Sequence, residues 1–189
     1  MSLTKNIKSF LNFLKKDTWQ SWLVSIILIV IFIKFIFFPV LSLITNSSLP
    51  LVVIESCSMY HESNFEEWWG KNSEWYNSRD ISKLEFNSFN FKNGLNKGDI
   101  ILVLGKKEYV KGDVIIFTAP TEHPIIHRIV VSSPLSTKGD NNLDQLEIEK
   151  NISQNAIIGK ATIRIPLLGW IKLIFFEPFK TAQQRGLCS

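Results

Sequence analysis

The stretch WQSWLVSIILIVIFIKFIFF, residues 19–38, decides how the rest of the chain is organised. Its residues are almost all apolar, and a helix of about twenty residues spans about 30 Å, the thickness of a bilayer's hydrocarbon core. The two tryptophans near its start suit one membrane interface, and Lys34 near its end can reach the headgroups of the other. The sequence therefore predicts a single transmembrane anchor, which we place at residues 19–43.

The flanks of this segment predict its direction. The tail at residues 1–18 carries four lysines, and positively charged flanks remain in the cytoplasm. The apolar run is longer than that of a cleaved signal peptide, and no small-x-small cleavage site closes it. We therefore expect a single-pass protein of the cell membrane, with a cytoplasmic amino terminus and an extracytoplasmic domain at residues 44–189.

Composition argues against several classes of protein. The net charge is +4 over 189 residues, but much of the positive excess lies in the tail, and no zinc-finger or RNA-recognition motif occurs, so nucleic-acid binding is not expected. The chain has no HExxH string, no paired CxxC string and no nucleotide-binding loop, so we predict neither a metal nor a cofactor. Cys57 and Cys188 define no disulfide framework, and a bond between them stays open.

Beyond Pro50 the chain changes to short apolar runs rich in Val, Ile and Phe. These runs have the length of strands, and the spacers between them carry Gly, Asp, Asn and Pro, which favour turns. The pattern predicts a mainly β domain built on an antiparallel sheet. The expected strands cover residues 51–54, 99–104, 113–118, 125–131 and 156–165.

Two segments interrupt this pattern. Residues 60–96 mix nine aromatic side chains with acids, amides and serines, which indicates either a small subdomain with its own core or a patch at the membrane interface. Residues 165–179, IPLLGWIKLIFFEPF, are too short and too charged for a second span. We expect this segment either to pack on the domain or to lie shallowly in the bilayer.

The residues that bear chemistry follow the anchor in a fixed order. The run ESCSM at residues 55–59 comes first, His127 lies in the run IHRIV at 126–130, and TKGDNN occupies residues 137–142. A serine hydroxyl is a poor nucleophile near neutral pH, so it needs a base within hydrogen-bond reach and an acid to orient that base. An imidazole titrates near neutral pH and can accept the serine proton there.

These three strings resemble the type I signal peptidases, in particular the archaeal and endoplasmic-reticulum branch. Residues 56–59 match that family's Ser-Gly-Ser-Met element at three of four places, IHRIV looks like its histidine box, and TKGDNN matches its glycine-aspartate-asparagine box. The resemblance implies that Ser58 is the nucleophile and His127 the general base. Because family members carry two aspartates here, it also implies Asp144 as the orienting acid and Asp140 as a supporting acid, an assignment that the close spacing leaves open.

The resemblance also implies the activity. It predicts a membrane-anchored serine endopeptidase that removes signal peptides from secretory preproteins after small-x-small sites. The developing oxyanion needs fixed donors, for which the backbone N–H of Ser58 and, by resemblance to bacterial members of the family, the hydroxyl of Ser56 are candidates. The expected partners are secretory preproteins, the lipid bilayer and accessory membrane subunits, with no nucleic acid among them.

Two departures from the family keep alternatives open. Cys57 stands where the family has glycine, which suggests a Cys-His protease, and the proline expected after Met59 is absent. A Ser/Lys enzyme would need one of Lys106, Lys107 or Lys111, which lack a surrounding motif. From a different class, a catalytically silent membrane-anchored β module would bind peptides or membrane partners through the same domain.

Overall fold

The computed structural model describes residues 2–188, and they divide into two compact units between Ile44 and Thr45. The first unit is helical. Its elements are α1 (Ser2–Leu14), α2 (Trp19–Phe32), the π-helix η1 (Ile33–Phe37) and α3 (Phe38–Thr45). Thr18 caps α2 by accepting the N–H of Ser21. The run Trp19–Thr45 is long and apolar enough, by length and composition, to cross a membrane.

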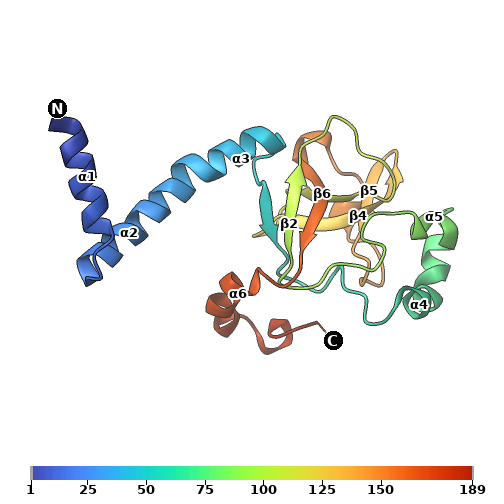
Figure 1. Ribbon diagram of the computed structural model, residues 1–189. Coiled ribbons are helices and arrows are strands. Elements are labelled where there is room, and N and C mark those ends of the chain that lie inside the picture. The colour runs from blue at the N-terminus through green and yellow to red at the C-terminus, as the bar shows by residue number, and fades with distance from the viewer. Residues whose placement is uncertain (1, 189) are drawn as a thin grey trace. The chain divides into compact units, whose positions relative to one another are not determined.

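The second unit is built on a six-stranded sheet (Figure 1). Its strands lie in the order β1-β2-β6-β3-β4-β5, and each neighbouring pair is antiparallel. Their bounds are β1 (Leu51–Val53), β2 (Ile100–Leu104), β3 (Val114–Phe117), β4 (Ile125–Ser132), β5 (Leu135–Lys138) and β6 (Ile157–Ile165). The predicted antiparallel sheet is thereby confirmed.

A mainly β chain is not confirmed, because helices hold 40% of the residues and strands 18%. Part of the helix belongs to the first unit. The rest includes α4 (Phe65–Asn77) and α5 (Lys83–Asn87), which form within residues 60–96, and α6 (Trp170–Phe176) near the end of the chain. Short 3-10 turns add η2 (Glu147–Glu149), η3 (Gln154–Ala156), η4 (Glu177–Phe179) and η5 (Ala182–Gln184). The chain is therefore mixed in its helix and strand content.

The sheet separates two hydrophobic cores. Neighbouring residues of a strand point to opposite faces, so Ile115 and Ile116 of β3 enter different clusters although both are fully buried. The Ile116 cluster includes Met59, the residue that follows Ser58. One core of the domain therefore anchors the segment that carries the predicted nucleophile.

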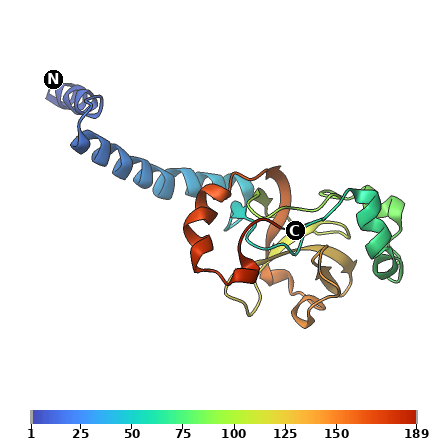
Figure 2. The same ribbon diagram turned by 90° about the horizontal axis from the view of Figure 1, so that it is seen from below.

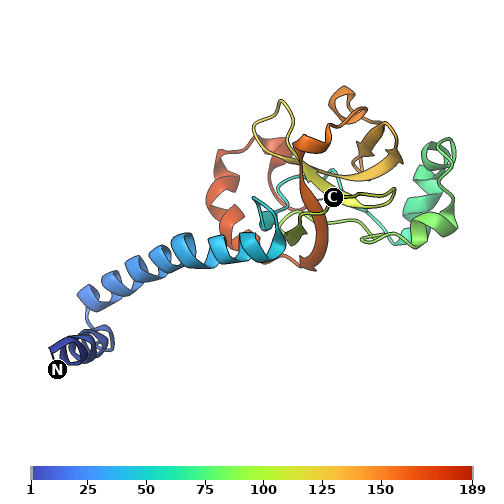
Figure 3. The same ribbon diagram turned by 90° about the horizontal axis from the view of Figure 1, so that it is seen from above.

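The aromatic side chains of residues 60–96 form a core of their own. Trp68, Trp69, Tyr76 and Phe86 are buried together and pack on Val130 of β4. Asn64 caps α4 and Ser82 caps α5, each through a side-chain oxygen that accepts a backbone N–H of the first turn. In each view these two helices lie together at one end of the domain, away from α6 (Figure 2 and Figure 3). The insertion is a small subdomain, because its aromatic side chains are mostly covered.

The carboxy-terminal segment packs on the domain by one side only. Leu173 of α6 is fully buried, whereas Ile171, Ile174 and Phe175 are each more than 60% exposed. Farther along, the buried Lys97 ammonium donates to the Glu177 carboxylate at 2.9 Å. Residues 165–179 therefore combine a packed side with an apolar side that faces outward.

The insertion core predicts an uneven response to truncation of two apolar side chains in α5. We expect Phe86→Ala to lower the free energy of unfolding by about 3–5 kcal/mol, because the ring is fully buried among aromatic neighbours. Leu84→Ala should change it by less than about 0.5 kcal/mol, since that side chain is 84% exposed. Urea unfolding of the detergent-solubilised chain, followed by tryptophan fluorescence, measures both. Equal losses would contradict a separate core.

Candidate active site

Two loops that leave opposite edges of the sheet form the candidate site. Ser58 follows β1 and Asn141 follows β5, the first and last strands in the order. The Asn141 backbone N–H nevertheless donates to the Ser58 carbonyl oxygen at 2.8 Å. The Asn141 side-chain amide donates to the Cys57 carbonyl at 3.1 Å. The sheet must therefore curl enough to bring the serine turn and the TKGDNN turn together.

Gly139 shows how closely the imidazole approaches these loops. A Cβ atom placed on Gly139 would lie 2.7 Å from His127 Nε2 and 2.8 Å from the Ser58 carbonyl oxygen. Both distances are shorter than real side-chain contacts, so only glycine fits here. His127 Nε2 and the Ser58 backbone thus border one atom-sized gap.

His127 comes from the middle of the sheet. It lies on β4 opposite Ile115 of β3, and only 4% of its surface is exposed. Its Nδ1 atom is hydrogen-bonded to the Glu149 carboxylate. Because a carboxylate only accepts, Nδ1 is the donor in this hydrogen bond, and Nε2 is the ring nitrogen near the Ser58 backbone.

Glu149 is the acid that the structure places on His127. It lies at the end of η2, and its carboxylate is fully buried. Besides His127, it accepts the Thr137 hydroxyl at 3.0 Å and the Leu146 backbone N–H at 2.8 Å. Sequence reasoning did not find Glu149, because it followed the aspartates of the motif and passed over the acids in LEIEK at residues 146–150.

Asp140 is held on other partners. Its buried carboxylate accepts two N–H groups of Arg128 at 3.0 and 2.7 Å, His61 Nε2 at 3.1 Å and the Tyr76 hydroxyl at 3.2 Å. These donors, above all the Arg128 charge, hold the pKa of Asp140 far below its usual range although burial opposes them. Within the described part of the chain, Asp140 has no hydrogen bond to His127, and its contacts suit a supporting acid.

Asp144 lies on the surface, where 68% of its side chain is exposed. It accepts the Trp75 indole N–H at 2.8 Å, and the Arg79 guanidinium lies 3.6 Å away. The Trp75 hydrogen bond is the main reason why the pKa of Asp144 is lowered. The described hydrogen bonds therefore place Glu149, rather than the expected Asp144, beside His127.

The two serines of the motif lie side by side. The Ser58 hydroxyl is 3.1 Å from the Ser56 hydroxyl, and Ser58 is half-buried while Ser56 is exposed. Among the described contacts, the Ser58 hydroxyl is hydrogen-bonded to Ser56 and not to His127. Such hydrogen bonds are often long in a free enzyme and shorten when substrate binds.

The lysines offer no comparable arrangement. Lys106 and Lys107 are exposed, and Lys111 is paired with Glu85 at 2.9 Å. Burial lowers the pKa of Lys138 to about 8, but its ammonium donates to the Gly139 carbonyl at 3.0 Å. It also lies 4.9 and 5.2 Å from the ring centres of two insertion aromatics. Nothing among these contacts points to a lysine base for Ser58.

Cys57 is joined to Cys188 by a disulfide, with 5.6 Å between the two Cα atoms. The bond links the residue before Ser58 to a position 131 residues later in the chain. A disulfide sulfur is not a free thiolate, so a Cys-His protease has no nucleophile in this state. The end of the chain is instead tied to the serine turn.

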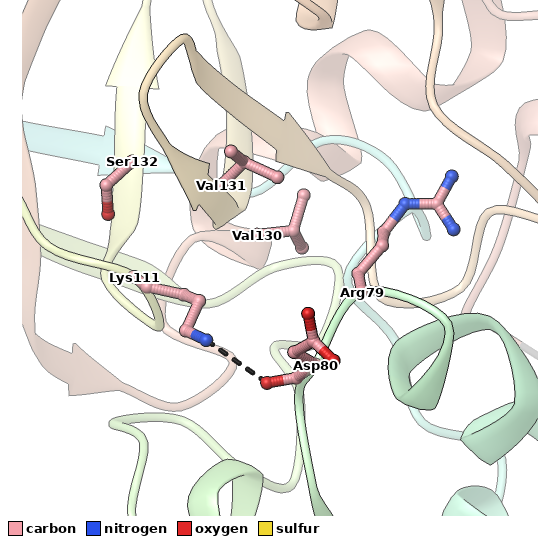
Figure 4. A pocket seen from close by; sticks show the side chains of 6 residues that line it. All are labelled: Arg79, Asp80, Lys111, Val130, Val131 and Ser132. Atoms are coloured by element: carbon pink, nitrogen blue, oxygen red, sulfur yellow. Dashed lines mark hydrogen bonds between the residues drawn. The ribbon is translucent and has the colours of Figure 1, made fainter.

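Two surface hollows lie elsewhere on the domain. One, of about 520 Å³, is lined by Leu167, Trp170, Gly186 and Leu187. The other, of about 420 Å³, lies between the insertion and β4 (Figure 4). In it the Lys111 ammonium points to the Asp80 backbone carbonyl, to which it donates at 3.3 Å. This second hollow marks a join between the insertion and the sheet.

The site therefore contains a serine hydroxyl, an imidazole close to the serine backbone and a buried carboxylate that fixes the imidazole. These are the parts that acyl transfer by a serine nucleophile requires. Comparison with models of known protein families finds no match, and comparison with curated proteins finds none either. The residues themselves carry the functional argument.

The disulfide predicts that the losses of stability caused by replacing its two cysteines are not additive. We expect Cys188→Ser to lower the free energy of unfolding by about 2–4 kcal/mol, because the unfolded chain regains the freedom that the cross-link removes. Adding Cys57→Ser should cause little further loss. Thiol labelling before and after reduction, with urea unfolding, tests both statements. A free thiol in the unreduced wild type would contradict the bond.

Proposed function

We propose that this protein is a membrane-anchored serine endopeptidase of the type I signal peptidase kind. Its substrates would be secretory preproteins, cut after small-x-small sites. The observation that carries the proposal is the position of His127, with Nδ1 held by the buried Glu149 and Nε2 beside the Ser58 backbone. That geometry supports a Ser-His-Glu arrangement in which each residue has one role.

The mechanism assigns each proton to an atom. Ser58 Oγ attacks the scissile carbonyl while His127 Nε2 accepts the hydroxyl proton. The Glu149 carboxylate stabilises the imidazolium that forms, and His127 then gives the proton to the leaving amine. Water, deprotonated by His127 Nε2, then attacks the acyl-enzyme. The imidazolium returns that proton to Ser58 Oγ, and the signal peptide leaves with a free carboxylate.

Two donors near the nucleophile suit the developing oxyanion. The Ser58 backbone N–H is one, and the Ser56 hydroxyl, 3.1 Å from Ser58 Oγ, is the other. A donor that is already in place stabilises the negative charge as it forms, without reorganisation of solvent. Ser56 would thus act on the transition state more than on substrate binding.

The free edge of β1 supports binding of an extended substrate. Ile54 bonds toward β2, since its N–H donates to Asp99 and its carbonyl accepts from Gly98. Alternation along an edge strand then turns the backbone of Glu55 away from β2, where its carbonyl accepts the Lys180 ammonium at 3.4 Å. An extended peptide can add to such an edge, which would bring its scissile bond toward Ser58.

Placement at the membrane follows from two apolar surfaces, each considered on its own. The run Trp19–Thr45 suits a single span, and the exposed side of α6 offers Ile171, Ile174 and Phe175 to an apolar environment. The lysines before Trp19 favour a cytoplasmic amino terminus. We therefore propose an extracytoplasmic catalytic domain in the plane where signal peptides emerge from the bilayer, with accessory membrane subunits as further partners.

The first activity prediction separates Glu149 from Asp144. Ser58→Ala should abolish cleavage of a secretory preprotein in detergent or liposomes. Glu149→Gln should lower kcat by about 10⁴-fold, as loss of the orienting acid does in triad proteases. Asp144→Asn should stay close to wild type, because that side chain is exposed on Trp75. Cut sites mapped by mass spectrometry provide the measurement.

The outcomes of that experiment distinguish the candidates. A large loss in Asp144→Asn with little loss in Glu149→Gln would overturn the acid assignment. A folded wild type that cleaves nothing, even with native membranes added to supply partners, would favour the silent membrane-anchored module instead.

The second activity prediction concerns the oxyanion. We expect Ser56→Ala to lower kcat by about 10²–10³-fold with KM nearly unchanged, since the hydroxyl acts on charge that develops in the transition state. Ser132→Ala, the same change on the exposed end of β4, is the matched control. An unchanged kcat in Ser56→Ala would remove Ser56 from the oxyanion site.

A further inference from the structure

The insertion contributes two buried donors to Asp140. His61 is 7% exposed and Tyr76 is fully buried. His61 Nε2 lies 3.1 Å from one Asp140 carboxylate oxygen, and the Tyr76 hydroxyl donates to the other at 3.2 Å. Arg128 also donates to both oxygens. The insertion thus shares the clamp on Asp140 with β4.

Asp140 is one residue away from the contact that holds the nucleophile. Its backbone N–H donates a hydrogen bond to Met59 Sδ at 3.4 Å. The next N–H, from Asn141, donates to the Ser58 carbonyl. The orientation of the Asp140 peptide therefore sets the direction of the hydrogen bond that places Ser58 near His127.

His61 has features that packing alone does not require. Its ring stacks on Trp68 with 3.7 Å between ring centres and a 6° angle between planes. Gly94 approaches it so closely that a Cβ would lie 2.6 Å from His61 Cδ2. Within the described chain its Nδ1 atom is buried without a hydrogen-bond partner, which costs about 1–3 kcal/mol. A phenylalanine would stack without that cost, so the Nε2 donor is the reason for an imidazole here.

Tyr76 keeps its proton. Burial, together with the Asp140 charge, raises the pKa of its hydroxyl well above the usual value. The hydroxyl therefore donates to Asp140 throughout the neutral range. Its aromatic ring packs edge-on against Phe86, with 4.9 Å between ring centres, which fixes the direction of the O–H group.

We propose that the insertion braces the active site, with His61 and Tyr76 as positioning residues that act on Ser58 through Asp140 and Asn141. The predicted effect on cleavage rests on the proposed function, whereas the predicted effect on hydrogen exchange does not. Loss of one donor leaves Asp140 less firmly held and lets the 140–141 peptide shift. Misplacement of a reacting group by about 1 Å can cost about 10²-fold in rate. The β1 edge is untouched, so KM stays the same.

The test uses substitutions that remove a donor and keep the packing. Tyr76→Phe removes only the hydroxyl. Tyr109→Phe is its matched control, because the Tyr109 hydroxyl accepts the Lys106 backbone N–H rather than donating to Asp140. His61→Phe keeps a ring to stack on Trp68, while His61→Gln restores an N–H donor. The full chain in detergent is assayed for kcat and KM on a secretory preprotein, and for amide hydrogen exchange in peptides that cover Asn141.

We expect Tyr76→Phe and His61→Phe to lower kcat by about tenfold or more with KM unchanged, and to speed exchange at Asn141 by about tenfold, as loss of a hydrogen bond to a charged group implies. His61→Gln should recover much of both, and Tyr109→Phe should resemble wild type. Unchanged exchange, or faster exchange with full kcat, would overturn the brace. If wild type cleaves nothing, the proposed function fails, while the exchange data still decide whether His61 and Tyr76 hold the turn.

Discussion

The hydrogen bond from the Asn141 N–H to the Ser58 carbonyl is the contact on which the rest of the site depends. It joins turns that leave the two edge strands, and the sheet alone cannot hold them together, because β1 and β5 have no strand pairing with each other. Gly139 makes the contact sterically feasible, since any side chain would fill the gap between His127 and Ser58. A strand histidine and a loop serine thereby become neighbours.

Strand parity explains why the site uses two different acids. His127 and Arg128 are consecutive on β4, so their side chains point to opposite faces of the sheet. Asp140 is on the Arg128 side, where the guanidinium also donates to three backbone carbonyls, those of Asn90, Phe91 and Gly112. An acid committed to that face cannot also orient the imidazole. The carboxylate for His127 has to come from elsewhere, and Glu149 supplies it.

Much of the architecture could be predicted from local pattern. The apolar segment from Trp19 and five of the six strands follow from runs of apolar residues bounded by turn residues, with ends shifted by one or two positions. The strand β5 was not predicted because three of the four residues of LSTK are polar, although every residue of it is buried. The helices α4 and α5 escaped because their aromatic side chains are spread among acids and amides, so the apolar stripe is short. In both cases tertiary packing determines the secondary structure, and a short stretch of sequence carries no information about that packing.

The site shows the same division. Ser58, His127 and Gly139 lie in short motifs whose residue types indicate nucleophilic catalysis, so they could be predicted from the sequence. Glu149 could not be chosen over Asp140 or Asp144 in that way, because the choice depends on which face of β4 each acid reaches. The path of the chain from Thr137 through η2 brings the Glu149 carboxylate to the His127 side of β4. There it also accepts hydrogen bonds from Thr137 and Leu146.

The serine turn lacks the proline that the proposed function leads one to expect beside the nucleophile, and other contacts restrain the turn instead. Proline beside a nucleophile restricts the backbone locally, and this chain has Tyr60 in its place. Here the restraint comes from tertiary contacts: the disulfide fixes Cys57, and the Met59 carbonyl accepts the Leu95 N–H at 2.7 Å, where the insertion returns to the sheet. The cross-link reduces the freedom of the unfolded turn, as a proline would, and the hydrogen bond from Leu95 holds the folded turn. The insertion and the end of the chain therefore belong to the construction of the serine turn, and a change in either should reach Ser58 without touching it.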